Sequence, residues 1–179
     1  QGLSMHNDKL DIAQILRRIP LFQELSQEQI EHLAAQTREK RLHKGEMLFQ
    51  KGDQPRGFYA IVYGQMKLAF PSAAGNEKVV EILGPQQSFG EAVMFMDRPY
   101  PVFAESLADT LLLHIARQAV FEMLETDASF ARRMLAGLAL RLIEEIGQVA
   151  GFVHDAHAAT AAAVRRLDDE RKANGLRDL

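Results

Sequence analysis

The hydrophobic and polar positions of this chain change their spacing along the sequence, and the changes predict a helical start, a β-rich middle and a long helical end. Between Asp11 and Arg18, apolar residues recur at helical intervals until Pro20 ends the segment. Ser26, followed by Gln29, has the pattern of a helix N-cap. We therefore expect two short helices before the strands begin.

The middle of the chain has the texture of a β-barrel or β-roll. From about Arg38 to Arg117, short apolar runs are separated by Gly, Pro, Asn and Asp, which predicts many short strands joined by turns. The expected strands are Lys40–Leu42, Met47–Gln50, Phe58–Tyr63, Gln65–Phe70, Lys78–Leu83, Ser88–Phe89, Phe103–Ser106 and Thr110–Ile115.

The end of the chain has the apolar spacing of a long helix. A short helix over Gln118–Glu125 ends before a cap at Asp127 or Ser129, and the long helix follows. Its apolar residues then repeat in alternating steps of four and three. Packing of the helix on its own barrel explains the apolar residues of the first turns. The repeat continues for longer than a small barrel can cover, however, so we expect the long helices of two copies to pair. The expected dimer interface consists of Leu135, Leu138, Leu142, Ile146, Val149 and Val153.

Composition narrows the functional classes. The chain has no cysteine, which excludes disulfides and the usual iron–sulfur clusters. Its formal net charge of −3 does not favour a protein that grips nucleic acid phosphates. No apolar run approaches a membrane span and no charged-then-apolar leader is present, so we expect a cytoplasmic protein without a membrane partner. No nucleophile elbow, P-loop or zinc-type HExxH motif occurs, so we expect neither an enzyme nor catalytic or metal-ligating residues.

Several glycine-punctuated segments occur in a characteristic order. They are Ile19–Phe22 before Leu25 and Ser26, Leu42–Glu46, Gln50–Asp53, Phe58–Leu68 and Phe89–Ala92. Together they resemble the sensor half of the Crp/Fnr transcription regulators. The string Glu91–Asp97 is most similar to the Dnr branch, whose members are haem-dependent nitric oxide regulators of denitrification.

The resemblance implies a mostly β fold with flanking helices. Its core is a double-stranded β-helix, or jelly roll, of the cyclic nucleotide-binding-like kind, followed by a long dimerisation helix. We expect the sensor β-roll and its N-terminal helices at residues 10–126, the dimerisation helix at 127–170 and a charged tail at 171–179. The family also implies a winged helix-turn-helix that reads DNA as a dimer. No such pattern follows Val149, so DNA contact is expected only through a reader domain that this chain lacks.

The resemblance places the ligand site at the cassette formed by Phe89, Gly90, Glu91 and Ala92. A strand entering a helix presents backbone N–H groups to an anion, and glycine permits close approach to the backbone. The glutamate accepts a hydrogen bond from a ribose hydroxyl. In members that bind cyclic nucleotides, an arginine about ten residues later pairs with the phosphate.

Here the position of that arginine falls at about Pro101, and the nearest arginine is Arg98. A desolvated phosphate without a bidentate partner loses about 1.5–3 kcal/mol, which argues against cyclic AMP or cyclic GMP. Glu91 then either caps the short helix or keeps a ribose-binding role. The expected ligand contacts are Phe89, Gly90, Glu91, Ala92, Arg98, Val102 and Phe103.

Three functions remain open, and the sequence does not identify the effector. The first is the effector-sensing and dimerisation part of a Crp/Fnr-type regulator, with a small molecule in the roll changing the packing of the dimer helix. The second is a stand-alone module that regulates a protein partner. The third is a haem-based nitric oxide sensor, for which Phe89, Val93, Met94, Phe95, Met96 and Phe103 would line an apolar cavity. Against it, no histidine lies between Ile15 and Leu25, where the Dnr-like proteins place theirs, although His154 and His157 lie on the long helix.

Overall fold

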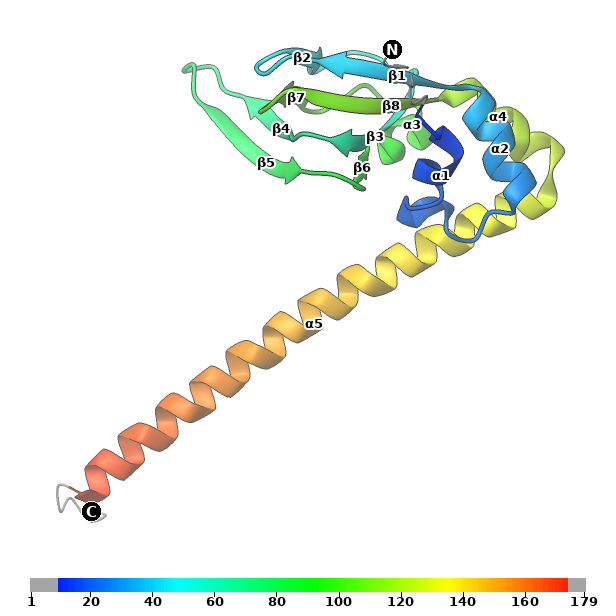
Figure 1. Cartoon of the computed structure of the whole chain (residues 1–179). Helices are drawn as coiled ribbons and strands as arrows, with labels where there is room; N and C mark the ends of the chain where they lie inside the picture. Colours follow the sequence, from blue (N-terminus) through cyan, green and yellow to red (C-terminus); the bar gives the residue numbers. More distant parts are fainter. Residues whose placement is uncertain (1–9, 174–179) are drawn as a thin grey trace, which may run out of the picture. The chain divides into compact units, whose positions relative to one another are not determined.

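Two antiparallel sheets form the body of the protein (Figure 1), which is known from a computed structural model that describes residues 10–173, without the side chains of residues 152 and 153. One sheet has the strand order β1-β8-β3-β6 and the other β2-β7-β4-β5. The strands are β1 (Thr37–Leu42), β2 (Met47–Phe49), β3 (Gly57–Tyr63), β4 (Met66–Pro71), β5 (Glu77–Leu83), β6 (Ser88–Phe89), β7 (Phe103–Ser106) and β8 (Thr110–Ala116). The expected jelly roll is confirmed, strand by strand.

The largest difference in strand ends is at β1, which begins at Thr37 rather than at Lys40. Its ladder with β8 is continuous from Thr37 opposite Ile115 to Leu42 opposite Thr110. The sequence Thr-Arg-Glu-Lys is too polar to indicate a strand by its pattern. This polar segment forms a strand because it pairs with the apolar strand β8, and its own pattern contributes little.

The helices are α1 (Ile12–Leu16), the 3₁₀ helix η1 (Pro20–Phe22), α2 (Gln27–Ala35), α3 (Glu91–Met96), α4 (Arg117–Thr126) and α5 (Ala128–Ala173). The predicted cap at Ser26 is a full capping box, because the Gln29 backbone N–H donates to Ser26 Oγ and the Ser26 N–H donates to Gln29 Oε1. Of the two candidate caps for the long helix, Asp127 is the one used, since it accepts from the Phe130 N–H at 3.2 Å.

The long helix differs from its expected bounds. It continues to Ala173, beyond the start of the tail expected at residues 171–179, and the remaining residues 174–179 lie outside the described part of the chain. The chain divides into two compact units with the boundary between Leu138 and Ala139. The first turns of α5 therefore belong to the first unit, whereas we expected a new unit to begin at residue 127. We call this first unit, described from residue 10 to residue 138, the sensor unit, after the role that the family resemblance implies. No helix among residues 10–173 is long and apolar enough to cross a membrane.

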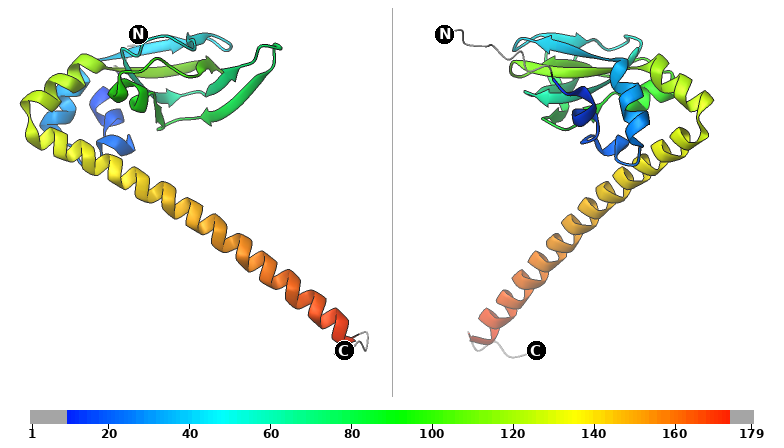
Figure 2. Two further views of the ribbon diagram at one scale, coloured as in Figure 1. Left: turned by 180° about the vertical axis from the view of Figure 1, so that it is seen from behind. Right: turned by 45° about the vertical axis from the view of Figure 1, so that its right-hand side comes forward.

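Two hydrophobic clusters hold the sensor unit together. The inner cluster lies between the sheets and contains Leu42, Phe49, Ile61, Met66, Leu83, Phe89, Tyr100, Ala104 and Leu112. The outer cluster joins β3 and β8 to the helices, which Figures 1 and 2 show gathered at one end of the roll. Its members include Phe22, Phe58, Met94, Leu113, Ile115, Phe130 and Met134. Burial of side chains of this size contributes about 1.5–3 kcal/mol each.

The start of α5 is packed tightly against the N-terminal helices. Phe130 and Met134 are buried in the outer cluster, and Leu138 packs against it. A Cβ atom on Gly137 would lie 2.2 Å from the carbonyl oxygen of Leu21, so only glycine fits at this crossing. The sensor unit thus fixes the first turns of the long helix.

Candidate ligand-binding site

The strand–glycine–helix cassette is present as predicted. Ser88 and Phe89 form β6, which pairs with Ala60 and Tyr59 of β3. Gly90 follows with φ of 91°, and α3 begins at Glu91. A left-handed φ costs a side-chain-bearing residue strain that glycine avoids, which explains the glycine between strand and helix.

Side chains of the cassette connect it to both hydrophobic clusters. Phe89 is only 4% exposed and its ring centroid lies 5.5 Å from that of Tyr59 in the inner cluster. Met94 of α3 is buried in the outer cluster, which also contains Met134 of α5. Glu91 is 7% exposed, whereas Ala92 faces solvent. One continuous hydrophobic cluster therefore connects the cassette helix with the start of the long helix.

The structure separates the other predicted ligand contacts. Arg98 lies on the surface, where its backbone N–H donates to the Val93 carbonyl and helps to end α3. Pro101 is exposed as well. Val102 packs against the inner cluster. Arg98 is the only arginine within residues 88–106.

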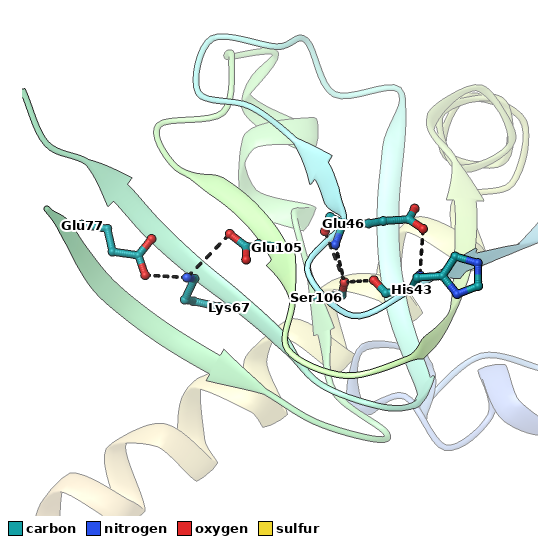
Figure 3. A network of polar contacts seen from close by, with 6 residues as sticks. All are labelled: His43, Glu46, Lys67, Glu77, Glu105 and Ser106. Atoms are coloured by element: carbon teal, nitrogen blue, oxygen red, sulfur yellow. Dashed lines mark hydrogen bonds and ion pairs between the residues drawn. The ribbon is translucent and has the colours of Figure 1, made fainter. Parts of the chain in front are cut away.

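Phe103 belongs to a charged cluster rather than to the interior of the roll. The Lys67 ammonium lies 5.7 Å from the centroid of its ring. Figure 3 shows the same ammonium between Glu77 and Glu105, and the hydrogen bond with Glu77 is the main cause of the raised pKa of Lys67. Neighbouring residues of a strand point to opposite faces, and Ala104 packs in the inner cluster. Phe103 therefore lies on the opposite face of β7 from Ala104, and its contact with a ligand stays a prediction.

A second polar network in Figure 3 holds the β1–β2 turn in place. The Ser106 hydroxyl donates to the carbonyl oxygen of His43, and the Glu46 N–H donates to the hydroxyl at 3.1 Å. The Glu46 carboxylate accepts from the His43 N–H at 3.0 Å. This network fixes the turn that precedes β2, which carries Phe49 into the inner cluster.

The sequence did not predict a cavity of about 600 Å³ at the end of the roll where β3 begins. We call it the aromatic cavity. It is lined by Arg38, Glu39, Lys40, Leu48, Phe49, Asp53, Gln54, Arg56, Tyr59, Tyr100 and His114. No residue of the cassette lines it, but Phe89 packs on two of its rings, those of Phe49 and Tyr59.

Burial changes the protonation of three groups at the aromatic cavity. The pKa of His114 is lowered by burial and then by the positive charge of Lys40. Burial raises the pKa of Tyr59, and it raises the pKa of Tyr100 further, together with the charges of neighbouring groups. At neutral pH the cavity thus contains a neutral imidazole and two protonated phenols.

The residues do not fit haem. Phe89 and Val93 pack in the inner cluster, whereas Met94 and Phe95 pack in the outer one, so they do not line one apolar cavity as expected. Met96 is exposed. His6 lies outside the described residues.

The predicted dimer stripe is apolar and exposed within one chain. Leu135, Leu142, Ile146 and Val149 are 65%, 58%, 66% and 65% exposed. Leu138 differs, because it packs against the outer cluster of its own chain. The side chain of Val153 lies outside the described residues.

Sequence comparison places the chain among known regulators. The family model described as the cyclic nucleotide-binding domain matches residues 39–127. The cyclic AMP receptor protein of Thermus thermophilus is 29% identical over 126 residues, which are 70% of this chain and 58% of that relative. The chain therefore spans little more than half the length of this curated relative.

Two solved structures of regulator domains match over most of their own length. The sensor domain of the transcriptional regulator DNR from Pseudomonas aeruginosa is 30% identical with a TM-score of 0.64, covering 75% of this chain and 90% of that domain. The N-terminal domain of a transcriptional regulator from Streptomyces coelicolor A3(2) is also 30% identical with a TM-score of 0.64, covering 73% and 94%. The matches in fold and in sequence thus agree.

Proposed function

Because this chain belongs to the Crp/Fnr-like cyclic nucleotide-binding domain family, we propose that it is the effector-sensing and dimerisation part of a transcription regulator. The observation that carries the proposal is the packing of Met94, on the cassette helix, in the same cluster as Met134 of the long helix. An effector that moves α3 changes this cluster, and with it the first turns of α5. Leu138 and Leu142 follow on the same helix and transmit the change, as a shift between two packed states.

The exposed stripe on α5 supports pairing of two copies. Leu142, Ile146 and Val149 recur at the intervals of a coiled coil, and each is more than half exposed in one chain. Burying a side chain of this size stabilises an assembly by about 1.5–3 kcal/mol, and a symmetric dimer gains each contact twice. The same residues in a monomer would leave an apolar surface in water.

Charge placed on the stripe tests the pairing. The double variant Leu142→Glu with Ile146→Glu is expected to be a monomer by size-exclusion chromatography with light scattering, at concentrations where the parent is a dimer. Gln148→Glu places a single carboxylate at an exposed position off the stripe and is expected to leave the dimer intact. A double variant that remains dimeric would show that another surface makes the contact.

The effector is proposed to be a small molecule other than cyclic AMP or cyclic GMP. Arg98, the only arginine within residues 88–106, lies on the surface, and Arg117 pairs with Asp97 at the end of α3, so we expect a cyclic phosphate to lack a bidentate partner. Isothermal titration calorimetry with either nucleotide is expected to show no saturable binding at nucleotide concentrations below the millimolar range. Micromolar or tighter binding would overturn this part of the proposal and restore a ribose-binding role for Glu91.

DNA binding by a longer form of the protein is part of the same proposal. An electrophoretic mobility-shift assay with the full-length gene product is expected to show a sequence-specific complex. A full-length product that binds no specific site, and instead retains its long helix in complex with another protein, would support the alternative of a module that regulates a protein partner.

A further inference from the structure

We propose that the aromatic cavity binds a small anion that carries an aromatic ring, at a site separate from the cassette. The ligand class is an aromatic carboxylate or phosphate monoester. The inference rests on the geometry of the cavity itself and does not depend on the proposed regulatory function.

Stacked rings form the floor of the cavity. The rings of Phe49 and Tyr100 are nearly parallel, with centroids 3.6 Å apart and an interplanar angle of 7°. The Tyr59 ring lies 6.3 Å from that of Phe49 at an angle of 29°, and the His114 ring lies 5.1 Å from that of Tyr59 at an angle of 47°. Aromatic rings gathered at one cavity favour a ligand with a planar ring, because stacked or edge-to-face contact adds to the burial of apolar area.

Polar groups at the floor are available to a ligand. The hydroxyls of Tyr59 and Tyr100 have no hydrogen-bond partner among residues 10–173, and both side chains line the cavity. Because burial raises their pKa values, both remain donors at neutral pH. Two phenol donors above an aromatic floor suit an acceptor such as a carboxylate or phosphate oxygen.

The rim of the cavity has more positive than negative side chains. Arg38, Lys40 and Arg56 line the cavity, and within the described part of the chain none of their side chains forms an ion pair or a hydrogen bond. Two acids belong to the same lining. Glu39 pairs with Arg41 at 3.5 Å, whereas Asp53 accepts a backbone hydrogen bond from Gln50 at 2.9 Å and its charge contributes to the raised pKa of Tyr100. The three unpaired cations outnumber these acids and therefore favour an anion.

The arrangement of the strands explains how these groups converge. Arg38 lies opposite His114 in the β1–β8 ladder, and His114 lies opposite Tyr59 in the β3–β8 ladder. Lys40 is two residues from Arg38 on β1 and so points to the same face. The volume of about 600 Å³ is that of a pocket for a small organic molecule rather than for a macromolecule.

Isothermal titration with three probes tests the proposal on the intact chain. Phenyl phosphate has both the ring and the charge, inorganic phosphate lacks the ring, and phenol lacks the charge. We expect saturable binding of phenyl phosphate, and at least tenfold weaker binding of the other two. Equal binding of phosphate would reveal a simple anion site, equal binding of phenol an apolar one, and no binding of phenyl phosphate an unused cavity; each outcome would overturn the proposal.

Matched variants locate the site. Lys40→Gln and Arg56→Gln are each expected to weaken phenyl phosphate binding about tenfold, which corresponds to about 1.4 kcal/mol. Lys44→Gln and Arg18→Gln remove the same charges at exposed positions outside the cavity and are expected to have no effect. If all four variants bind phenyl phosphate equally, the ligand lies elsewhere.

Intrinsic fluorescence gives an independent readout. The chain has no tryptophan and three tyrosines, of which Tyr59 and Tyr100 line the cavity. Tyr63→Phe removes the remaining phenol, so binding in that variant must change the tyrosine emission. The monomeric Leu142→Glu, Ile146→Glu variant is expected to bind phenyl phosphate normally, which separates failure of this site from failure of the dimer proposal.

Discussion

Gly90 is the residue that lets a strand pass directly into the cassette helix. Its φ of 91° is in the left-handed region, and a Cβ atom there would meet Phe58 and Tyr100 only at ordinary contact distances of 3.7 Å. Gly90→Ala should therefore lose stability through the backbone alone, by about 1–2 kcal/mol in denaturant unfolding. Gly84→Ala, at a glycine without a left-handed φ and with open space, is the control and should change stability little. Equal effects of the two changes would contradict the conformational explanation.

His114 gives the sensor unit a predictable response to pH. Burial lowers its pKa below the ordinary 6.5, so the unfolded chain binds this proton more readily than the folded one. Its contribution to stability is fully present above pH 6.5 and declines as the pH falls through the folded pKa. The groups that face it are Tyr59 on β3 and the cations Arg38 and Lys40 on β1, which oppose protonation further.

The variant His114→Phe keeps a ring against Tyr59 but cannot be protonated. Compared with the parent, it should lose less of its free energy of unfolding between about pH 7.5 and pH 5. The measurement is urea unfolding at both pH values. An identical loss in the two proteins would mean that other groups cause the acid sensitivity.

At the residue scale, the sequence predicted the backbone of the cassette better than its side chains. A glycine followed by a glutamate, here Gly90 and Glu91, correctly indicated that a strand passes into a helix at this point. Phe103 was assigned to the interior of the roll, whereas it lies opposite Ala69 in the β4–β7 ladder with the Lys67 ammonium 5.7 Å from its ring centroid. The sequence pattern around it does not alternate clearly, so only the ladder decides which face each residue occupies.

At the scale of elements, the strands were predictable because glycine turns separate them. Gly45, Gly52, Gly64 and Gly75 all have positive φ and lie between strands, so the turns mark the strand ends. The 3₁₀ helix η1 was not predicted. Pro20 was read as the end of a helix, whereas its fixed φ also suits the start of the next turn.

The crossing of α5 over η1 depends on Gly137. A Cβ atom would lie 2.2 Å from a backbone oxygen of Leu21, which cannot move away as a side chain can. Gly137→Ala should destabilise the sensor unit by about 1–3 kcal/mol in thermal unfolding, because the added methyl group would push α5 away from the backbone of Leu21.

Gly147→Ala is the matched change on the same helix. No atom lies within 4 Å of a Cβ atom built there, so alanine should stabilise the helix by up to about 1 kcal/mol through propensity. We expect Gly137→Ala to lower the free energy of unfolding and Gly147→Ala to raise it. If Gly137→Ala also stabilises the protein, the start of α5 does not rest on Leu21.

At the scale of the whole molecule, the aromatic cavity shows what a single sequence cannot reveal. Its walls come from β1, β2, the loop after β2, β3, β8 and Tyr100, which span residues 38–114 of the chain. Arg38 and Lys40 occupy alternate positions on the polar strand β1, which predicts that one face of this strand is positively charged. The pattern does not predict which residues lie opposite that face. Only the two-sheet closure brings this face over the aromatic rings.

The long helix beyond Leu138 has few buried side chains of its own. Leu142, Ile146, Val149, Val164 and Leu167 are all more than half exposed. Helices in proteins owe most of their stability to the packing of an apolar face, so we expect this segment to need a partner to remain helical. If the partner is a second copy, mass action makes the folded helix depend on protein concentration.

Far-ultraviolet circular dichroism across a concentration series of about 1–100 µM measures this dependence. The helical signal and the melting temperature of the parent should rise with concentration. The Leu142→Glu, Ile146→Glu variant should show a lower, concentration-independent helical signal while its β-roll stays folded, since its sensor unit ends at Leu138 and contains neither substitution. A parent whose helical signal is the same at every concentration and in the variant would show that the helix is stable alone, and the exposed stripe would then need an explanation other than pairing.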